Sequence, residues 1–156
     1  DTGVILQNRG SFFSLDPGHV NTLEPGKRTF HTLMPAMAFK GGKPKFLYGT
    51  QGGEGQPQTQ TALITRMIDY GMDPQTAVHE PRWVWGRTWG ERVEGVRIES
   101  RVAPEVIEKL RKHGHHVSIV GDFDGVMGHA GIIEIDDRGF LRGGSDPRSD
   151  GAAIGS

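Results

Sequence analysis

Residues 45–71 read KFLYGTQGGEGQPQTQTALITRMIDYG, and they contain the clearest structural signals in the chain. The apolar run at 45–48 predicts a strand. Pro57 stands where the first turn of a helix needs no N–H, and Gly71 follows as a left-handed cap. Between them, apolar residues recur at the spacing of one helix face: Leu63, Ile64, Met67 and Ile68. The stretch therefore predicts a strand, a glycine-rich turn and a helix near 57–70.

Similar signals lie on both sides of this stretch. Upstream, the apolar run 33–39 and the next strand flank Lys40-Gly41-Gly42-Lys43, which predicts a hairpin. Because the run 33–39 is nearly continuous rather than alternating, we expect it to be buried on both faces. Downstream, Asp73-Pro74 begins a short second helix, and Pro104 begins a third that ends near His113.

Further strands are expected between the helices. The candidate ranges are 4–7, 82–85, 93–99, 116–120, 132–135 and 140–141. The last two ranges flank a second hairpin turn, and residues 12–27, which are rich in Pro, Gly and Asn, predict a surface loop. Helices that fall between groups of antiparallel strands indicate one α+β unit with helices layered on a sheet.

The composition excludes several classes of protein. The chain has 156 residues and 24 glycines, about twice the ordinary frequency, and tight turns between short strands explain most of them. The net charge of −1 predicts neither a nucleic-acid nor an anionic-membrane partner, and no apolar run approaches the ~20 residues of a membrane span. The lack of cysteine excludes disulfides, thiolate catalysis and Cys-ligated metals. The first residue is Asp1, which suggests a processed or truncated product.

Three clusters have both a functional and a structural interpretation. They are His113, His115 and His116; Asp122 to Gly125; and Trp83, Trp85 and Trp89. The histidines could hold a metal, but no carboxylate joins them, which favours a solvated turn. The aspartates resemble part of a calcium loop without its later ligands, and the tryptophans could stack on a base only beside a basic surface. We therefore expect turns and packing, with no metal and no cofactor.

The segment Gly49-Thr50-Gln51-Gly52-Gly53 has a distinct chemical possibility. Adjacent glycines let the backbone approach a ligand closely, with N–H groups free to point at an anion. Such a nest can be a phosphate site or an oxyanion hole, although no Gly-Lys-Ser/Thr follows as in a P-loop. The spacing alone also fits a plain turn, so both interpretations stay open.

Several stretches, taken together, resemble the γ-glutamyltransferase family, N-terminal-nucleophile amidases made as a proenzyme and cut into two chains. In family order they are Gly3–Asn8, Pro25–Arg28, Met34-Pro35, Gly49–Gly53, Ile68–Met72, Ala77–Arg82 and Gly144–Arg148, the last resembling the end of the family's small subunit. The resemblance implies an α+β fold of the αββα type, with helices outside two stacked antiparallel sheets. The chain is expected to be one unit, the carboxy-terminal part of that small subunit.

The resemblance also implies a mechanism. The family's small subunit begins with Thr, whose free α-amine activates its own hydroxyl for attack on an amide, and the resulting acyl-enzyme passes its acyl group to water or an amine. Neither Asp1 nor Thr2 can replace that Thr. We therefore expect the nucleophile on a missing strand, and a large subunit from the same precursor as partner. Alone, the chain should be inert; a non-catalytic fragment is the alternative outside the enzyme class.

Two pairs of residues take family roles by position. Gly52 and Gly53 fall on the family's Gly-Gly, whose backbone N–H groups hold the oxyanion, and this favours the nest over the plain turn. His31 and Thr32 fall on paired serines that bind the substrate α-carboxylate. Thr32 keeps a hydroxyl, and His31 can still donate a hydrogen bond.

Two departures from the family change the expected substrate. Arg9 falls where the family has a polar residue near the substrate α-amine, and Phe12 falls on the acidic residue that pairs with that amine. A cation and an apolar ring suit an acidic acyl group without the amine, as in family relatives that act on glutaryl-type amides, cephalosporin side chains or oxamate. Typical γ-glutamyl transfer or glutathione hydrolysis is the alternative. The loop 14–26 is also shorter than the family's lid.

Overall fold

The computed structural model describes residues 3, 7–87 and 93–155 of the chain. It contains two compact units, residues 1–33 and residues 34–156. The smaller unit has a 3-10 turn at Arg9–Phe12, followed by turns and one bridge between Ser14 and Thr22, so the loop expected here is confirmed. The strand expected at 4–7 falls largely outside the described residues.

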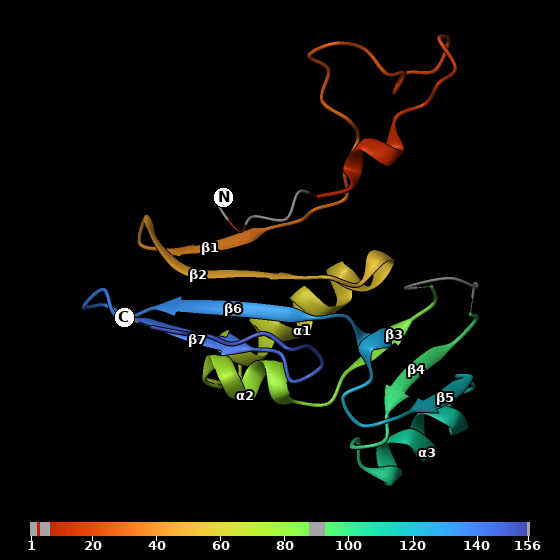
Figure 1. Ribbon diagram of the computed structural model, residues 1–156. Coiled ribbons are helices and arrows are strands. Elements are labelled where there is room, and N and C mark those ends of the chain that lie inside the picture. Colours follow the sequence, from red (N-terminus) through yellow and green to blue (C-terminus); the bar gives the residue numbers. More distant parts are fainter. Residues whose placement is uncertain (1–2, 4–6, 88–92, 156) are drawn as a thin grey trace. The chain divides into compact units, whose positions relative to one another are not determined.

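The larger unit is built on a four-stranded antiparallel sheet with the strand order β1-β2-β6-β7 (Figure 1). The strands are β1 (Ala36–Lys40), β2 (Lys43–Thr50), β6 (Ala130–Ile135) and β7 (Leu141–Ser145). Both expected hairpins are present, β1 with β2 and β6 with β7. Pairing of β2 with β6 then brings distant parts of the sequence together at the centre of the sheet.

Two helices cover one face of this sheet (Figure 1). They are α1 (Gln56–Ile68) and α2 (Pro74–His79), and each has a proline in its first turn, as the sequence predicts. Leu63 and Met67 of α1 and Val78 of α2 are buried against Phe46 and Ile132 of the sheet. The apolar stripe of the first helix therefore supplies much of the main core.

A smaller sheet in the same unit has the strand order β3-β4-β5. Its elements are β3 (Trp83–Trp85), β4 (Val96–Glu99), α3 (Pro104–Lys112) and β5 (Val117–Val120). β3 and β4 are antiparallel, but β4 and β5 are parallel, which corrects the expectation of antiparallel strands. The cause is α3, because a helix between two strands returns the chain to the same end of the sheet, as parallel pairing requires. Ile107 of α3 is buried against Val96 and Ile98.

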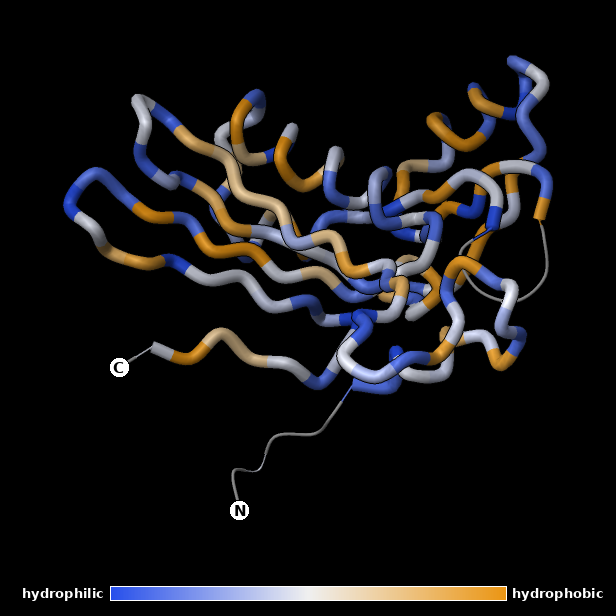
Figure 2. Tube along the Cα trace, turned by 90° about the horizontal axis from the view of Figure 1, so that it is seen from above, coloured by the Kyte–Doolittle hydropathy of each residue, from blue (hydrophilic) through white to orange (hydrophobic). Residues whose placement is uncertain are grey.

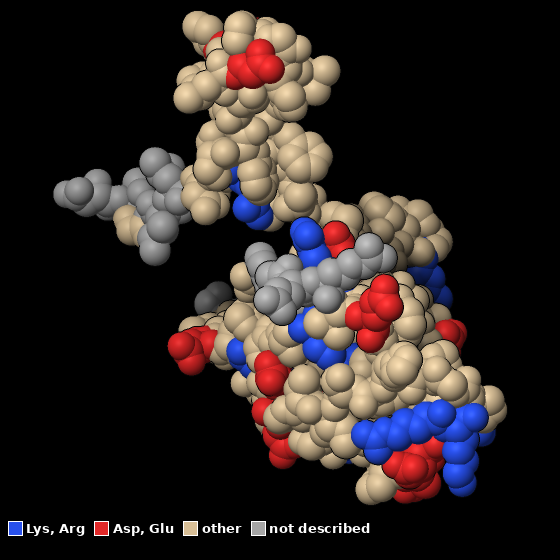
Figure 3. Space-filling view, turned by 90° about the vertical axis from the view of Figure 1, so that its right-hand side faces the viewer, with Lys and Arg blue, Asp and Glu red and all other residues tan. Residues whose placement is uncertain are grey.

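Charged side chains of both signs stand together on the face that includes α3 (Figure 3). α3 has Glu105 in its first turn and Lys109, Arg111 and Lys112 in its last, the order that the helix dipole favours. Arg111 also pairs with Glu108 at 2.7 Å.

Within the described residues, no helix combines the length and the apolarity needed to cross a membrane.

The face of the larger sheet opposite α1 and α2 is open. Met37, Leu47 and Ile133 stand there in cross-strand register, and the exposed fractions of Met37 and Ile133 are 48% and 41%. Figure 2 shows hydrophobic residues recurring along these neighbouring strands. Apart from the tail at Ala152 and Ala153, the described residues of the larger unit place no layer over this face. The run 33–39 is therefore not buried on both faces in this chain, and its expected cover by a missing strand and a large subunit stays a prediction.

A buried network of charges joins the two sheets. Arg148, which follows β7, pairs with Glu99 of β4 at 2.6 Å and with Asp146 at 3.0 Å. Arg82, which precedes β3, pairs with Asp146 at 2.6 Å, and Arg101 pairs with Glu99 at 2.8 Å. Arg82, Glu99, Asp146 and Arg148 are all buried. A buried charge without a partner is costly, so each member of the network depends on the others.

Burial and ion pairing shift the pKa values of Arg82 and Asp146 in opposite directions. Burial lowers the pKa of Arg82 to about 10, although Asp146 acts to raise it. Burial works to raise the pKa of Asp146, but the Arg82 guanidinium and the N–H donors of Arg148 and Ala130 outweigh it and hold that carboxyl pKa below its ordinary value. Asp146 therefore stays ionised in the folded protein.

In the complete protein, Asp146→Asn should lower the free energy of unfolding at neutral pH by about 3–5 kcal/mol, because two buried arginines lose their shared counter-charge. The folded pKa of Asp146 lies below the unfolded value. Its stabilisation is therefore present above the ordinary carboxyl pKa and is lost as the pH falls through the lowered one. Denaturant unfolding from neutral to acid pH measures both effects. Asp150→Asn, exposed in the same tail, is the control, and equal stability of the two variants would contradict the prediction.

Candidate functional site

The glycine-rich turn after β2 joins the centre of the larger sheet to α1. β2 ends at Thr50, and a 3-10 turn at Gly53–Gly55 leads directly into α1. Gly52 has a φ of 144° and Gly53 a φ of 53°, both in the region that favours glycine. A side chain at either position would therefore strain the backbone.

Backbone hydrogen bonds hold this turn in place. Gln51 and His129 exchange two of them: the Gln51 N–H donates to the His129 carbonyl at 2.8 Å, and the His129 N–H donates back at 3.2 Å. The Thr50 hydroxyl oxygen lies 3.0 Å from the same His129 carbonyl oxygen. Gly55 closes the turn by donating its N–H to the Gly52 carbonyl at 2.9 Å.

The N–H groups of Gly52 and Gly53 are the chemically distinctive feature of the turn. Within the described part of the chain neither donates a hydrogen bond, although Gly52 is buried. A buried N–H without a partner is uncommon and costs about 1–3 kcal/mol. Both groups also precede the N-terminus of α1, where the helix dipole favours negative charge. The arrangement can therefore bind an anionic oxygen, as in an oxyanion hole or a carboxylate site.

In the smaller unit, Arg9 and Phe12 form one cluster. Both belong to the 3-10 turn, and the guanidinium carbon of Arg9 lies 5.2 Å from the centre of the Phe12 ring. Phe12 also contacts Phe30, with ring centres 6.0 Å apart, and is 40% exposed. The described residues offer no hydrogen-bond partner to Arg9 Nε. The cluster therefore presents a cation beside an apolar surface.

His31 and Thr32 lie in the same smaller unit, and both are exposed. His31 Nδ1 accepts a hydrogen bond from the Leu33 N–H at 3.3 Å. The smaller unit thus holds the four expected substrate-binding residues, whereas the glycine turn belongs to the larger unit.

The described residues of the other sequence clusters lie at a helix end, in turns and on strands. His113 ends α3, and its Nδ1 lies 2.7 Å from a carbonyl oxygen of the last turn. The carboxylate of Asp124 caps a 3-10 turn. Among the described residues, no group of three His, Cys, Asp or Glu side chains could hold a metal ion. Trp83 and Trp85 are about half exposed at an edge strand, and Trp89 lies outside the described residues.

Two residues that support the glycine turn cannot be identified from the sequence alone. Gly128 approaches the Gln51–Gly52 peptide closely, and Arg82 donates a hydrogen bond to the Gly128 carbonyl at 3.0 Å. Arginine is seldom fully buried, so the sequence gives no reason to place Arg82 in the interior. The only local signal at Gly128 is its residue type, which it shares with the glycines of ordinary turns.

Comparison with known proteins matches the whole chain to a single family. The family model described as gamma-glutamyltranspeptidase matches residues 1–156. The glutathione hydrolase-like YwrD proenzyme of Bacillus subtilis is 71% identical over 155 residues, and the oxamate amidohydrolase proenzyme of Klebsiella pneumoniae is 50% identical over 155 residues. The crystal structure of cephalosporin acylase from Bacillus halodurans matches with a TM-score of 0.72 and 40% identity, covering 97% of this chain and 27% of that one.

The alignments with the two curated relatives also show how much of each relative the chain covers. They cover 99% of it but only 30% and 29% of the two curated relatives. The chain therefore spans less than a third of the length of these proteins, both of which are named as proenzymes.

Proposed function

The chain belongs to the gamma-glutamyltranspeptidase family, and we propose that it forms part of an amidase that works through an acyl-enzyme. The N-terminal-nucleophile fold class of the family, expected from the sequence motifs, is confirmed by the match to a solved acylase. The observation that carries the proposal is the glycine turn. It offers two N–H groups without partners in the described chain, beside a helix N-terminus.

The proposed reaction develops negative charge at this turn. A hydroxyl nucleophile attacks the amide carbonyl and gives its proton to a base, and the N–H groups of Gly52 and Gly53 stabilise the resulting oxyanion. Collapse of the tetrahedral intermediate breaks the C–N bond, and the amine leaves with that proton. Water or an amine then attacks the ester through the same oxyanion site and releases the acid or a new amide. By resemblance to the family, the nucleophile is an N-terminal Thr outside residues 1–156.

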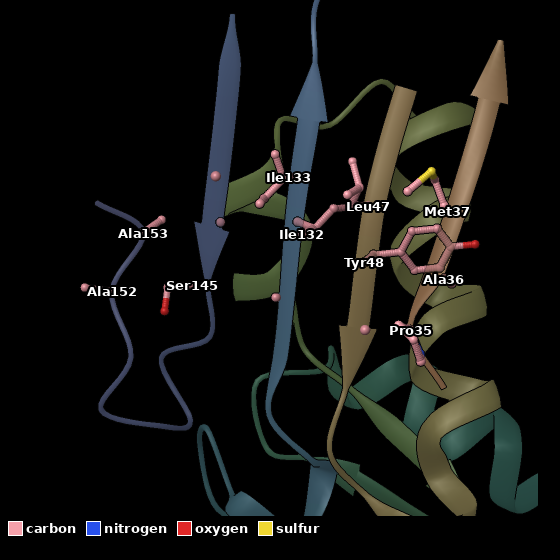
Figure 4. Close-up of a pocket in the computed structure, with 14 residues that line it drawn as sticks. Pro35, Ala36, Met37, Leu47, Tyr48, Ile132, Ile133, Ser145, Ala152 and Ala153 are labelled. Carbon is pink, nitrogen blue, oxygen red and sulfur yellow. The ribbon is translucent and has the colours of Figure 1, made fainter. Parts of the chain in front are cut away.

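The open face of the larger sheet is the proposed docking surface for the rest of the same precursor. Met37, Leu47 and Ile133 stand on neighbouring strands there (Figure 4). A hollow of about 690 Å³ lies beside them, and Ala152 and Ala153 of the C-terminal tail line its other side. Stacked sheets interdigitate their side chains at a separation of ~10 Å, so a second sheet would fill this hollow. By resemblance, that sheet comes from the nucleophile strand and the large subunit.

The acyl donor is proposed to be acidic and to lack an α-amine. Arg9 beside Phe12 repels an ammonium group and attracts a carboxylate, which His31 and Thr32 are proposed to help hold. Relatives named oxamate amidohydrolase and cephalosporin acylase agree with donors other than γ-glutamyl groups. The second candidate is glutathione hydrolysis, and the observation in its favour is the 71% identity to a protein named glutathione hydrolase-like.

Produced alone, residues 1–156 should aggregate or stay loosely packed, because the apolar sheet face has no cover. Ile133→Lys should make the isolated chain more soluble and prevent its assembly with the co-expressed remainder of the protein. Ile119→Lys is the control, because Ile119 is 50% exposed on the smaller sheet. Gel filtration and thermal unfolding check both effects. A soluble wild-type monomer with a sharp, cooperative transition would count against the docking surface.

In the complete two-chain protein, Gly53→Ala should lower kcat for amide hydrolysis about 10²–10³-fold, the usual cost of losing an oxyanion donor. The φ of 53° at this position disfavours a side chain, so the peptide should twist. Gly139→Ala is the control, because Gly139 has a φ of 90° and open space around it. The assay uses a panel of chromogenic amides, and intact mass should reveal a chain that begins with Thr. Turnover of Gly53→Ala within a few-fold of wild type would remove the turn from the mechanism.

The wild-type enzyme should prefer a glutaryl anilide to the matching γ-glutamyl anilide, and Phe12→Asp should shift this preference toward the γ-glutamyl donor. A charge-assisted hydrogen bond to the ammonium group is worth about 1.5–3 kcal/mol, which corresponds to a shift of about ten- to a hundredfold in the ratio of kcat/KM values. Phe12→Asn introduces a side chain of the same shape as aspartate but without its charge, and it should shift the ratio far less. A wild type that prefers the γ-glutamyl donor, with a ratio that Phe12→Asp leaves unmoved, would refute this reading of the donor.

A further inference from the structure

Gly128 and the Gln51–Gly52 peptide approach each other more closely than side chains allow. Gly128 follows a 3-10 turn at Gly125–Met127 and has a φ of 77°. A Cβ atom on Gly128 would lie 2.0 Å from the Gln51 carbonyl oxygen, and one on Gly52 would lie 3.3 Å from the Gly128 Cα. Two backbones therefore touch directly, and Gly128 forms the wall behind the glycine turn.

Gly128 is itself fixed by a buried ion pair. Its carbonyl accepts a hydrogen bond from Arg82 Nη1 at 3.0 Å, and the same nitrogen lies 2.6 Å from an Asp146 carboxylate oxygen. Asp146 also accepts a hydrogen bond from the Ala130 N–H at 2.7 Å. Arg82 and Asp146 are each only 2% exposed. Both ends of the segment 128–130 are therefore tied to one ion pair that cannot turn toward solvent.

The middle of that segment holds the turn as well, because His129 exchanges two backbone hydrogen bonds with Gln51. A continuous set of contacts thus runs from the ion pair through 128–130 to the turn. Two adjacent glycines have little conformational preference of their own, so the direction of their N–H groups has to come from packing. Oxyanion holes depend on donors that are oriented before the reaction.

We propose that Gly128, fixed by the Arg82–Asp146 ion pair, is a positioning residue that directs the N–H groups of Gly52 and Gly53 toward the substrate oxygen. This role rests on the proposed amidase function and adds a second purpose to a buried ion pair that also stabilises the fold. Gly128 and Arg82 act through the turn and do not touch the substrate. Their loss should therefore lower kcat and leave KM nearly unchanged, since the oxygen carries its negative charge mainly in the transition state.

The decisive variants are Gly128→Ala and Arg82→Lys in the complete two-chain protein. Gly128→Ala pushes the Gln51–Gly52 peptide away and should lower kcat about 10²–10³-fold, like the loss of an oxyanion donor. Arg82→Lys keeps a charge near Asp146 but loses the planar fork, and should lower kcat about tenfold. In both, KM should stay within about threefold of wild type. Gly42→Ala is the matched control, because Gly42 shares the φ of 77° and has no atom within 4 Å of an added Cβ.

A second measurement does not depend on turnover. With isotope-labelled glycine, the amide resonances of Gly52 and Gly53 should move in Arg82→Lys and stay in place in Gly42→Ala. If Gly128→Ala does not fold, Arg82→Lys and these resonances decide the question. An active wild type, together with unchanged resonances or an unchanged kcat in folded Arg82→Lys, overturns the positioning role alone. A wild type that hydrolyses no amide overturns the proposed function and the positioning role together.

Discussion

Asp146 is shared by Arg82 and Arg148 in the interior, and the placement of both sheets depends on this sharing. The two hydrophobic clusters are separate, one between α1, α2 and the larger sheet and one beneath α3, and buried ion pairs connect the parts of the chain that carry them. Arg148 reaches across to Glu99 and to the carbonyl of Val78. Hydrophobic burial is non-directional, whereas a buried guanidinium requires its partners at hydrogen-bonding distances. The buried ion pairs therefore fix the placement of the two sheets, and the apolar clusters pack within that arrangement.

The strand that carries the glycine turn is also a central strand of the open sheet. β2 lies between β1 and β6, its outward face contributes Leu47 to the apolar surface, and its end leads into Gly52. Under the proposed function, docking of the remaining precursor and formation of the oxyanion site involve the same strand. If both proposals hold, covering this face and forming the oxyanion site depend on one strand, which gives such a protein a physical reason to be inactive before assembly.

Local signals predict the local part of this structure. Pro57 and the apolar stripe behind it define α1, and the Gly41-Gly42 turn defines the first hairpin. The parallel pairing of β4 with β5 was missed, because that contact forms between distant segments and depends on the course of α3. The burial of Arg82 was missed for a similar reason, since its partners come from Asp146 and the Gly128 carbonyl, far along the chain. Spacing alone also leaves the glycine pair ambiguous, because the contact with Gly128 that separates a fixed turn from a plain one is tertiary.

The two units differ in how freely their residues can change. In the larger unit, Gly52 and Gly128 are restricted by positive φ and by a contact that no side chain fits. In the smaller unit, Phe12 is partly exposed and His31 is exposed, so a substitution there meets little steric resistance. If the turn performs the proposed chemistry and the smaller unit recognises the donor, the reaction can stay fixed while the substrate varies. Relatives named glutathione hydrolase-like, oxamate amidohydrolase and cephalosporin acylase agree with such a division, and its physical basis is the unequal steric freedom of the two units.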